Sequence, residues 1–280
     1  MIKLFYLGLF IFGFQFLSVA QDKSCCSTEK DVSFASFSEQ KEFRDIHQIP
    51  AAFTLKDAKG TMITFKTKDG KTANGYFVKS EKPSDKFVFV FHEWWGLNDY
   101  IKREAEKLQV DLVNTNVLAL DLYDGKIAET PGVAQELMGG LKDDRARLII
   151  QGALNYVGVK AKVFTLGWCM GGGWSMQTAL MAGNQLGACV LYYGMPETEV
   201  GKLKTLKGDV LGIFGTKDAW INTEVVSQFE ANMKKAGRKL TVKNYDADHA
   251  FANPSNPKHD VTAAADAYKV SLVFLKSRIK

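Results

Sequence analysis

Five short runs made almost entirely of apolar residues recur along the chain and predict buried strands. They lie at residues 87–91, 117–120, 163–166, 189–193 and 210–214. Runs of this length without polar alternation are typical of strands covered on both faces, as in a parallel sheet. Stretches with helical spacing follow them at residues 99–113, 132–157, 172–183, 223–236 and 261–278. Strand alternating with helix predicts an α/β fold, with a mostly parallel central sheet and helices on both of its faces.

The beginning of this fold has a different pattern. Residues 61–67 and 72–79 alternate apolar and polar side chains around the turn signal Asp69-Gly70, which predicts a hairpin at the sheet edge. Residues 21–55 are rich in Ser, Lys, Glu and Asp without a clear period, and we interpret them as an N-terminal tail or a loosely docked lead-in. The simplest organisation is therefore one domain over residues 56–280.

Residues 1–20 have the pattern of a secretory signal peptide. Lys3 supplies the positive charge, residues 4–17 are almost continuously apolar, and Ser18-Val19-Ala20 offers small residues for cleavage after Ala20. A membrane anchor is the alternative, but this run is shorter than the roughly 20 residues that a spanning helix needs. The expected product is periplasmic or secreted and keeps no stable membrane anchor after cleavage.

Charge and cysteine content narrow the possible functions. The formal net charge is only +5, and the Lys and Arg residues are scattered, which argues against binding to nucleic acid. The four cysteines are too few and too unevenly spaced for a disulfide framework. Cys189 lies in an apolar strand and is expected to be inert core, whereas Cys25 and Cys26 are interpreted as tail thiols, with metal binding or chain pairing as alternatives. We expect a monomer.

The segment Gly167-Trp168-Cys169-Met170-Gly171 is the most informative chemical motif. An apolar strand precedes it and helical spacing follows, which is the nucleophile-elbow pattern with Cys in place of Ser. The thiol would project above the sheet at a helix N-terminus, where partial positive charge favours the thiolate. A phosphate-binding loop is one alternative, although the Gly-x-Gly-x-x-Gly pattern is absent, and an ordinary buried thiol is the other.

An acid and a base follow in the order that such hydrolases use. Asp218 lies in the loop after the strand at 210–214, and His249 follows the alternating residues 240–245. The other histidines are less suitable, because His47 precedes the fold, His92 precedes the nucleophile and His259 lies in a polar stretch. We therefore expect Cys169 as nucleophile, His249 as general base and Asp218 as the group that orients the imidazole.

The loop after the strand at 87–91 is expected to complete the site. In this type of fold that loop and the residue after the nucleophile supply the oxyanion-hole amides, which would be the backbone N–H groups of Trp94 and Met170. Glu93 is a carboxylate at the same strand end, and its alternative role is a solvated loop charge. All five tryptophans lie within five residues of Glu93, Cys169 or Asp218, which favours an aromatic-walled pocket.

Taken together and in order, these motifs resemble the dienelactone hydrolase family. The matching segments are residues 92–98, 121–123, 167–172, Asp218 and 249–252, within a region from Thr61 to Leu275. The resemblance implies an α/β-hydrolase fold, and hydrolysis of an enol-lactone such as carboxymethylenebutenolide without a metal or an organic cofactor. It also implies that Glu93 helps to activate the thiol.

Two departures from the family pattern concern the substrate. Family members that act on dienelactone hold its carboxylate with arginines, and this chain has Lys126 and Asn253 where they are expected. A lysine does not reproduce a bidentate arginine contact, so the carboxylated substrate is in doubt. The residues expected to line the substrate pocket are Trp95, Trp168, Trp220, Tyr123, Lys126 and Asn253.

The leading hypothesis is an exported cysteine-dependent hydrolase that cleaves a small ester or lactone through an acyl-enzyme. A non-catalytic protein that binds a small ligand and retains the hydrolase fold is the alternative, suggested by the missing arginines. A redox protein is the third hypothesis, and the absence of a Cys-x-x-Cys motif argues against it.

Overall fold

A computed structural model of the chain describes residues 1–2, 34–254 and 256–279. The predicted cleavage after Ala20 and the pair Cys25-Cys26 lie outside these residues. The described residues from 34 to 279 belong to one unit. Within the described part of the chain, no helix combines the length and apolar character needed to cross a bilayer.

Eight strands form one sheet in the order β1-β2-β4-β3-β5-β6-β7-β8. Their bounds are β1 Thr61–Lys66, β2 Thr72–Val78, β3 Lys86–Phe91, β4 Asn116–Asp121, β5 Lys162–Trp168, β6 Leu186–Tyr192, β7 Asp209–Gly215 and β8 Leu240–Tyr245. β1 and β2 pair antiparallel, β2 joins β4 antiparallel, and every pair from β4 through β8 is parallel. The predicted α/β fold with an edge hairpin is confirmed.

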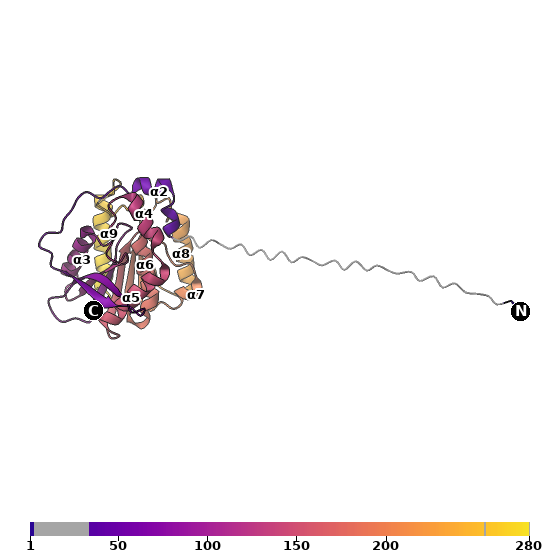
Figure 1. Ribbon diagram of the computed structural model, residues 1–280, viewed down its shortest axis with the longest axis horizontal. Helices are drawn as coiled ribbons and strands as arrows, with labels where there is room; N and C mark the ends of the chain where they lie inside the picture. The colour runs from indigo at the N-terminus through magenta and orange to yellow at the C-terminus, as the bar shows by residue number, and fades with distance from the viewer. Residues whose placement is uncertain (3–33, 255, 280) are drawn as a thin grey trace. The chain divides into compact units, whose positions relative to one another are not determined.

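Helices cover both faces of this sheet. The described helices are α1 Phe34–Phe37, α2 Lys41–Ile46, α3 Asp99–Asp111, α4 Pro131–Gly140, α5 Asp143–Val157, α6 Met170–Ala182, α7 Val200–Leu203, α8 Thr223–Ala236 and α9 Val261–Lys276, with the 3₁₀ turn Gly183–Gln185 after α6. α3 and α9 lie on one side and α5 and α6 on the other (Figure 1). The hydroxyl of Tyr268 on α9 donates to Asp111 on α3 at 2.7 Å, which ties the first pair together.

The prediction of one helix over residues 132–157 is wrong, because two helices occupy this stretch. α4 ends on the pair Gly139-Gly140, and Leu141 then has an extended backbone with φ −67° and ψ 109°. Glycine is a poor helix former, and α5 restarts with Asp143 and Asp144, whose charges suit a helix N-terminus.

The lead-in before the sheet is more ordered than its sequence indicates. Residues 34–46 contain the two short helices α1 and α2, and Phe43 on α2 is fully buried. The ring of Phe43 packs edge-on against Trp94 and Trp220, with centroid distances of 5.5 and 5.2 Å. These aromatic contacts fix the lead-in over the loops that follow β3 and β7.

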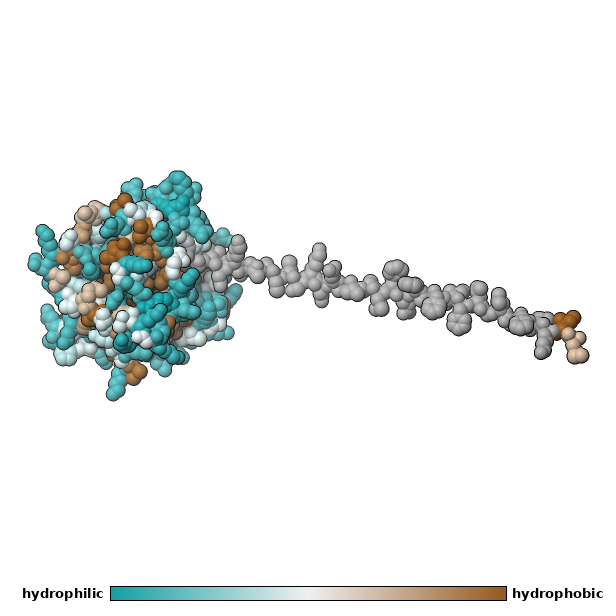
Figure 2. Space-filling view, viewed as in Figure 1, coloured by the Kyte–Doolittle hydropathy of each residue, from teal (hydrophilic) through white to brown (hydrophobic). Residues whose placement is uncertain are grey.

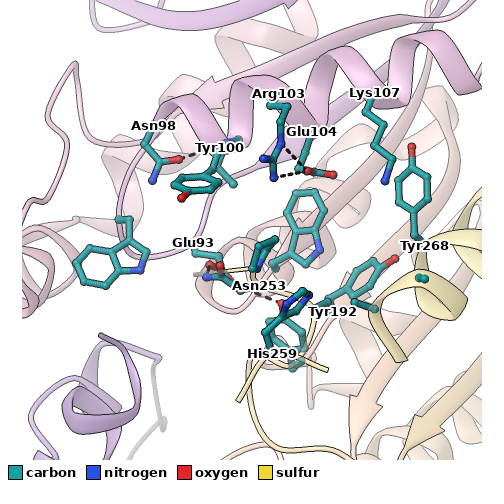
Figure 3. A pocket seen from close by; sticks show the side chains of 18 of the residues that line it. Glu93, Asn98, Tyr100, Arg103, Glu104, Lys107, Tyr192, Asn253, His259 and Tyr268 are labelled. Carbon is teal, nitrogen blue, oxygen red and sulfur yellow. Dashed lines mark hydrogen bonds and ion pairs between the residues drawn. The ribbon is translucent and has the colours of Figure 1, made fainter. Parts of the chain in front are cut away.

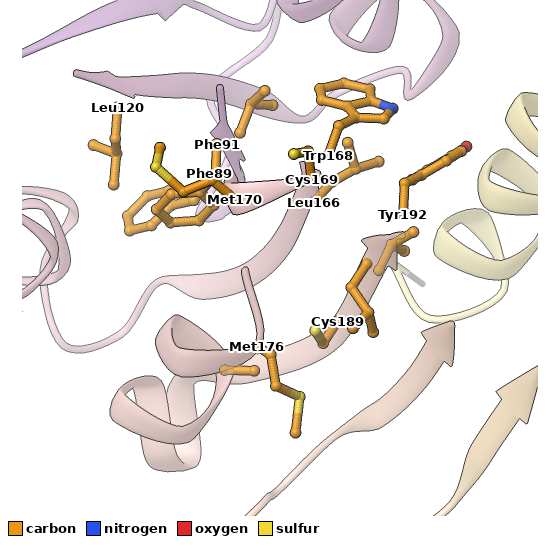
Figure 4. Close-up of a cluster of buried hydrophobic side chains, with 14 of the residues drawn as sticks. Phe89, Phe91, Leu120, Leu166, Trp168, Cys169, Met170, Met176, Cys189 and Tyr192 are labelled. Atoms are coloured by element: carbon orange, nitrogen blue, oxygen red, sulfur yellow. The ribbon is translucent and has the colours of Figure 1, made fainter. Parts of the chain in front are cut away.

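The hydrophobic core lies around the central strands and reaches the end of β5. Figure 4 shows Cys169 and Met170 directly after β5, beside Phe89, Phe91 and Leu166. All five side chains are buried. The face of the molecule seen in Figure 2 is largely hydrophilic, with hydrophobic residues gathered near its middle. Cys169 directly follows β5, so its sulfur lies at the carboxyl edge of the sheet, next to the buried core.

Candidate active site

Cys169 occupies a strained turn between β5 and α6. Its φ of 55° and ψ of −122° place a non-glycine residue in a region that L side chains rarely adopt. The turn needs glycine on both sides. A Cβ on Gly167 would lie 2.1 Å from the Gly171 carbonyl oxygen, and one on Gly171 would lie 2.4 Å from the carbonyl oxygens of Phe91 and His92. Strand and helix thus approach closely enough to form the nucleophile elbow.

The three predicted triad residues come together. The Cys169 Sγ lies 3.3 Å from the His249 Nε2, and the His249 Nδ1–H donates to the Asp218 Oδ2 at 2.6 Å. All three residues are almost completely buried. The Asp218 Oδ1 also accepts from the backbone N–H groups of Trp220 and Ile221, at 2.8 and 2.9 Å. A sulfur, an imidazole and a carboxylate are therefore aligned as in a Ser-His-Asp triad.

The pKa values of Asp218 and Cys169, the two ends of this hydrogen-bonded triad, shift in opposite directions. Burial by itself raises the pKa of Asp218, but the attraction of His249 and the hydrogen bonds outweigh it, so the pKa lies below its usual value. Burial raises the pKa of the Cys169 thiol well above its usual value, and the charge of Glu93 adds to this effect. Burial thus opposes the stabilisation of the thiolate that is expected at a helix N-terminus, and the Met170 amide offsets it only in part.

Glu93 faces the triad from the loop after β3. Its Oε1 accepts from the Tyr193 hydroxyl at 3.4 Å, and its Oε2 accepts from the Asn253 side-chain amide. Burial raises the pKa of Glu93 to about 7, although His249, Tyr193 and Asn253 all favour the charged form. The interpretation of Glu93 as a solvated loop charge is wrong, since the residue is only 7% exposed.

One of the two predicted backbone donors, the Met170 N–H, contacts the sulfur. The Met170 N–H hydrogen-bonds the Cys169 sulfur and lowers the thiol pKa, against the larger effect of burial. Trp94 is fully buried in the loop after β3, and its indole Nε1–H has no hydrogen-bond partner among the described residues. The neighbouring His92 ring is held by its Nδ1–H, which donates to the Glu93 carbonyl oxygen at 2.6 Å. These contacts give the loop that carries Trp94 a defined conformation.

A cavity of about 370 Å³ opens beside Glu93. Trp95, Trp168 and Asn253 line it as predicted, together with Glu93 and Tyr193. Figure 3 shows Glu93 and Asn253 side by side in this lining. The α3 residues that line it include Arg103, Glu104 and Lys107, with Tyr268 from α9 and His259 from the loop before α9. Aromatic walls with a few polar groups are typical of small-molecule sites.

Comparison with known proteins agrees with this arrangement. The family model described as "Dienelactone hydrolase family" matches residues 73–279, which is most of the chain. The chain belongs to the dienelactone hydrolase family. This is a hydrolase family, and the chain is a dienelactone hydrolase-like hydrolase with the α/β-hydrolase fold.

Three relatives illustrate the range of this dienelactone hydrolase family. A protein of Aquifex aeolicus, provisionally named a carboxymethylenebutenolidase, is 28% identical over 79% of this chain and 100% of its own length. A carboxymethylenebutenolidase of Pseudomonas sp. strain P51 is 30% identical over 41% of this chain and 47% of its own. A dienelactone hydrolase-like promiscuous phosphotriesterase from metagenomic libraries shares the fold at a TM-score of 0.68 and 22% identity, covering 79% of this chain and 99% of its own.

Three predicted pocket residues lie outside the lining of the cavity. Trp220 instead packs against Phe43 and donates its indole N–H to the Gln40 side-chain oxygen at 2.9 Å. The Tyr123 hydroxyl donates to the Met170 sulfur at 3.3 Å, so this ring contacts the residue that follows the nucleophile. Lys126 is exposed in the turn after β4. It therefore does not line the cavity as predicted.

Several residues of the site were missed from the sequence. His47 and Phe43 come from the lead-in, which has no periodic pattern that would have placed it over the triad. His259 was set aside because its surroundings are polar, yet it lines the cavity. Arg103 and Lys107 also line the cavity, and their i,i+4 spacing on one helix face was the available signal.

Proposed function

We propose that the chain is a cysteine-dependent hydrolase of small esters or lactones, acting through Cys169, His249 and Asp218. The observation that carries this proposal is the pair of contacts on His249, at 3.3 Å to the sulfur and 2.6 Å to the carboxylate. A base that is hydrogen-bonded to its nucleophile on one side and to an orienting group on the other is the arrangement that nucleophilic catalysis needs.

Catalysis begins from a neutral thiol. His249 accepts the proton of Cys169 as the sulfur attacks the substrate carbonyl carbon, and Asp218 stabilises the imidazolium. The Met170 N–H and the Trp94 backbone N–H stabilise the negative charge that develops on the carbonyl oxygen. His249 then gives its proton to the leaving alcohol oxygen, which leaves a thioester on Cys169. Water, deprotonated by His249, hydrolyses the thioester and restores the thiol.

The cavity indicates where the substrate binds. Glu93 and Trp168 line it, Trp168 directly precedes Cys169 in the chain, and the charge of Glu93 acts on the thiol. The acyl group therefore occupies the cavity and approaches the sulfur from the Glu93 side. Because Cys169 is fully buried and does not line the cavity, the side chains that separate the two must move before a carbonyl reaches the sulfur. The small volume favours a short ester or a single-ring lactone.

The test is hydrolysis of p-nitrophenyl acetate and of an enol-lactone by the wild type and two cysteine variants. We expect Cys169→Ala to lower kcat/KM by at least about 1,000-fold, since removing a triad nucleophile abolishes the covalent route. Cys189→Ala removes a second fully buried thiol and should keep the wild-type rate. Equal turnover by wild type and Cys169→Ala would refute the proposal, as would stoichiometric ligand binding without turnover.

Export is a second part of the proposal, supported by the pattern of residues 1–20. Expression of the full chain in a bacterium, followed by fractionation and intact mass measurement, tests it directly. The expected product starts at Gln21 and lies in the periplasm or the medium. A product that retains residues 1–20 and stays in the cytosol would contradict this part without affecting the hydrolase proposal.

A further inference from the structure

A second buried histidine lies beside the triad and has no part in the proposed hydrolysis. His47 directly follows α2, is only 3% exposed, and packs its ring 5.5 Å from the His249 ring and 4.7 Å from Trp94. Its Nδ1–H donates to the Phe43 carbonyl oxygen at 2.6 Å. The proton is thereby fixed on Nδ1, and Nε2 presents a lone pair. This Nε2 is buried and has no hydrogen-bond partner among the described residues.

An unpaired buried nitrogen costs folding free energy unless something binds it. Burial and the neighbouring His249 together lower the pKa of His47 to about 3, so the ring is neutral and does not take up a proton instead. One ligand atom each from His47, Cys169 and His249 lies within 4.8 Å of the other two. These are two neutral imidazole nitrogens and a sulfur, a soft donor set that transition metals prefer to oxygen ligands.

The distances fit a tetrahedral ion after a small adjustment. With metal–sulfur and metal–nitrogen bonds of about 2.3 and 2.0 Å, ligand atoms in a tetrahedral zinc site are about 3.5 Å apart. The Cys169 Sγ and the His249 Nε2 already lie 3.3 Å apart. All three ligand atoms lie within 4.8 Å of one another, so only the longer separations must shorten toward about 3.5 Å when the ion binds.

The surroundings also suit a dication. The Nδ1–H of His249 is held by Asp218, and that of His47 by a backbone carbonyl, which are the outer contacts that orient metal-binding histidines. Glu93 and Asp218 place negative charge near the sulfur and disfavour the free thiolate. The same two carboxylates would balance the charge of a divalent ion.

From these contacts we infer that His47, Cys169 and His249 form a Zn²⁺ site with three protein ligands and one open position. On binding, the Cys169 S–H bond breaks, the sulfur bonds to the metal, and the proton leaves to solvent. Both histidines bind as neutral rings. Because the ion engages the nucleophile and the base together, zinc blocks hydrolysis reversibly and shields the sulfur from oxidation. Three protein ligands with an open position is a common zinc arrangement.

Direct metal binding by the full chain tests this inference without relying on activity. Because Cys25 and Cys26 could also bind zinc, the measurements use a background with both changed to Ser. Zn²⁺ affinity is measured by competition with a chromophoric chelator, and Co²⁺ is the spectroscopic probe. We expect one ion per chain, with a cobalt–thiolate charge-transfer band that Cys169→Ser abolishes.

The decisive experiment compares the zinc affinity of His47→Gln with that of His259→Gln. The outer contacts of metal ligands are worth about 10- to 100-fold in affinity, so loss of the ligand itself should weaken zinc binding by at least about 100-fold. His259 lies at the cavity and not among the three ligand atoms, so its variant should keep the wild-type zinc affinity. Circular dichroism and thermal melts confirm that each variant is folded.

Two results would overturn the inference: no saturable binding of zinc at one ion per chain, or equal affinity in the parent and His47→Gln. Zinc inhibition of ester hydrolysis, normalised to the zinc-free rate of each protein and reversed by EDTA, is a separate readout. If the chain proves inactive toward esters, the chelator and cobalt measurements still decide the metal site.

Discussion

Replacing Glu93 by Gln tests the electrostatics of the site through stability. Glu93 is buried, and its pKa is raised from 4.5 to about 7, chiefly by the loss of water. An acid whose folded pKa exceeds its unfolded pKa binds its proton more tightly when folded, so its contribution to stability is complete at low pH. That contribution is lost as the pH rises from about 4.5 through 7. Gln has nearly the same shape, hydrogen-bonds to Asn253 and Tyr193, and carries no charge at any pH.

The size of the effect follows from the shift in pKa. A tenfold change in proton affinity corresponds to about 1.4 kcal/mol, so the ionised Glu93 costs the folded state about 3 kcal/mol above pH 7. We expect Glu93→Gln to be more stable than the wild type by about this amount at pH 8.5. The two proteins should be equal near pH 4. For a domain of this size the difference corresponds to a rise in Tm of about 6–12 °C at the higher pH.

Urea unfolding at a series of pH values measures this difference. The quantity of interest is the free energy of unfolding of the variant minus that of the wild type, because other titrating groups cancel in it. Glu136→Gln changes the same functional group at an exposed position on α4 and is the matched control. A difference for Glu93→Gln that stays constant between pH 4 and 8.5 would refute the reasoning.

Three further variants probe the elbow, the triad and the lead-in. Gly171→Ala places a methyl group 2.4 Å from two backbone oxygens, so we expect a loss of activity of more than about 100-fold and a lower Tm; wild-type values would contradict the close approach. Asp218→Asn should lower kcat by about 10³- to 10⁴-fold with the fold intact by circular dichroism, because the imidazole loses its orienting acceptor. Phe43→Ala removes a fully buried ring and should lower the free energy of unfolding by about 3–5 kcal/mol. Iodoacetamide should also label Cys169 faster in this variant. Unchanged labelling would show that α2 does not control access to the sulfur.

The order of strands and helices was predictable because each buried strand carries its own signal. The run at residues 87–91 is apolar at every position, and β3 Lys86–Phe91 occupies almost the same residues. The break at Leu141 was missed because apolar residues continue with helical spacing on both sides of it. Two consecutive glycines at 139 and 140 were the signal for the helix end.

The triad was predictable because its members follow strands whose order along the chain is regular. The protonation state of Cys169 was not predictable in this way. It depends on how completely the sulfur is buried, and the side chains packed around the site include Phe43 and His47, which contact the His249 ring and are more than 100 residues away from Cys169 in the sequence. Short polar segments such as the lead-in acquire their conformation from the surface they contact, and periodicity carries no information about that surface.

The lead-in has a consequence for how the site can be altered by substitution. Cys169, Asp218 and His249 all lie within residues 73–279, which the family model matches, whereas α2 and His47 precede them. Phe43 and His47 pack on the His249 ring from outside the sheet. Substitutions in residues 34–47 can therefore change the surroundings of the general base while the triad and all eight strands keep their sequence.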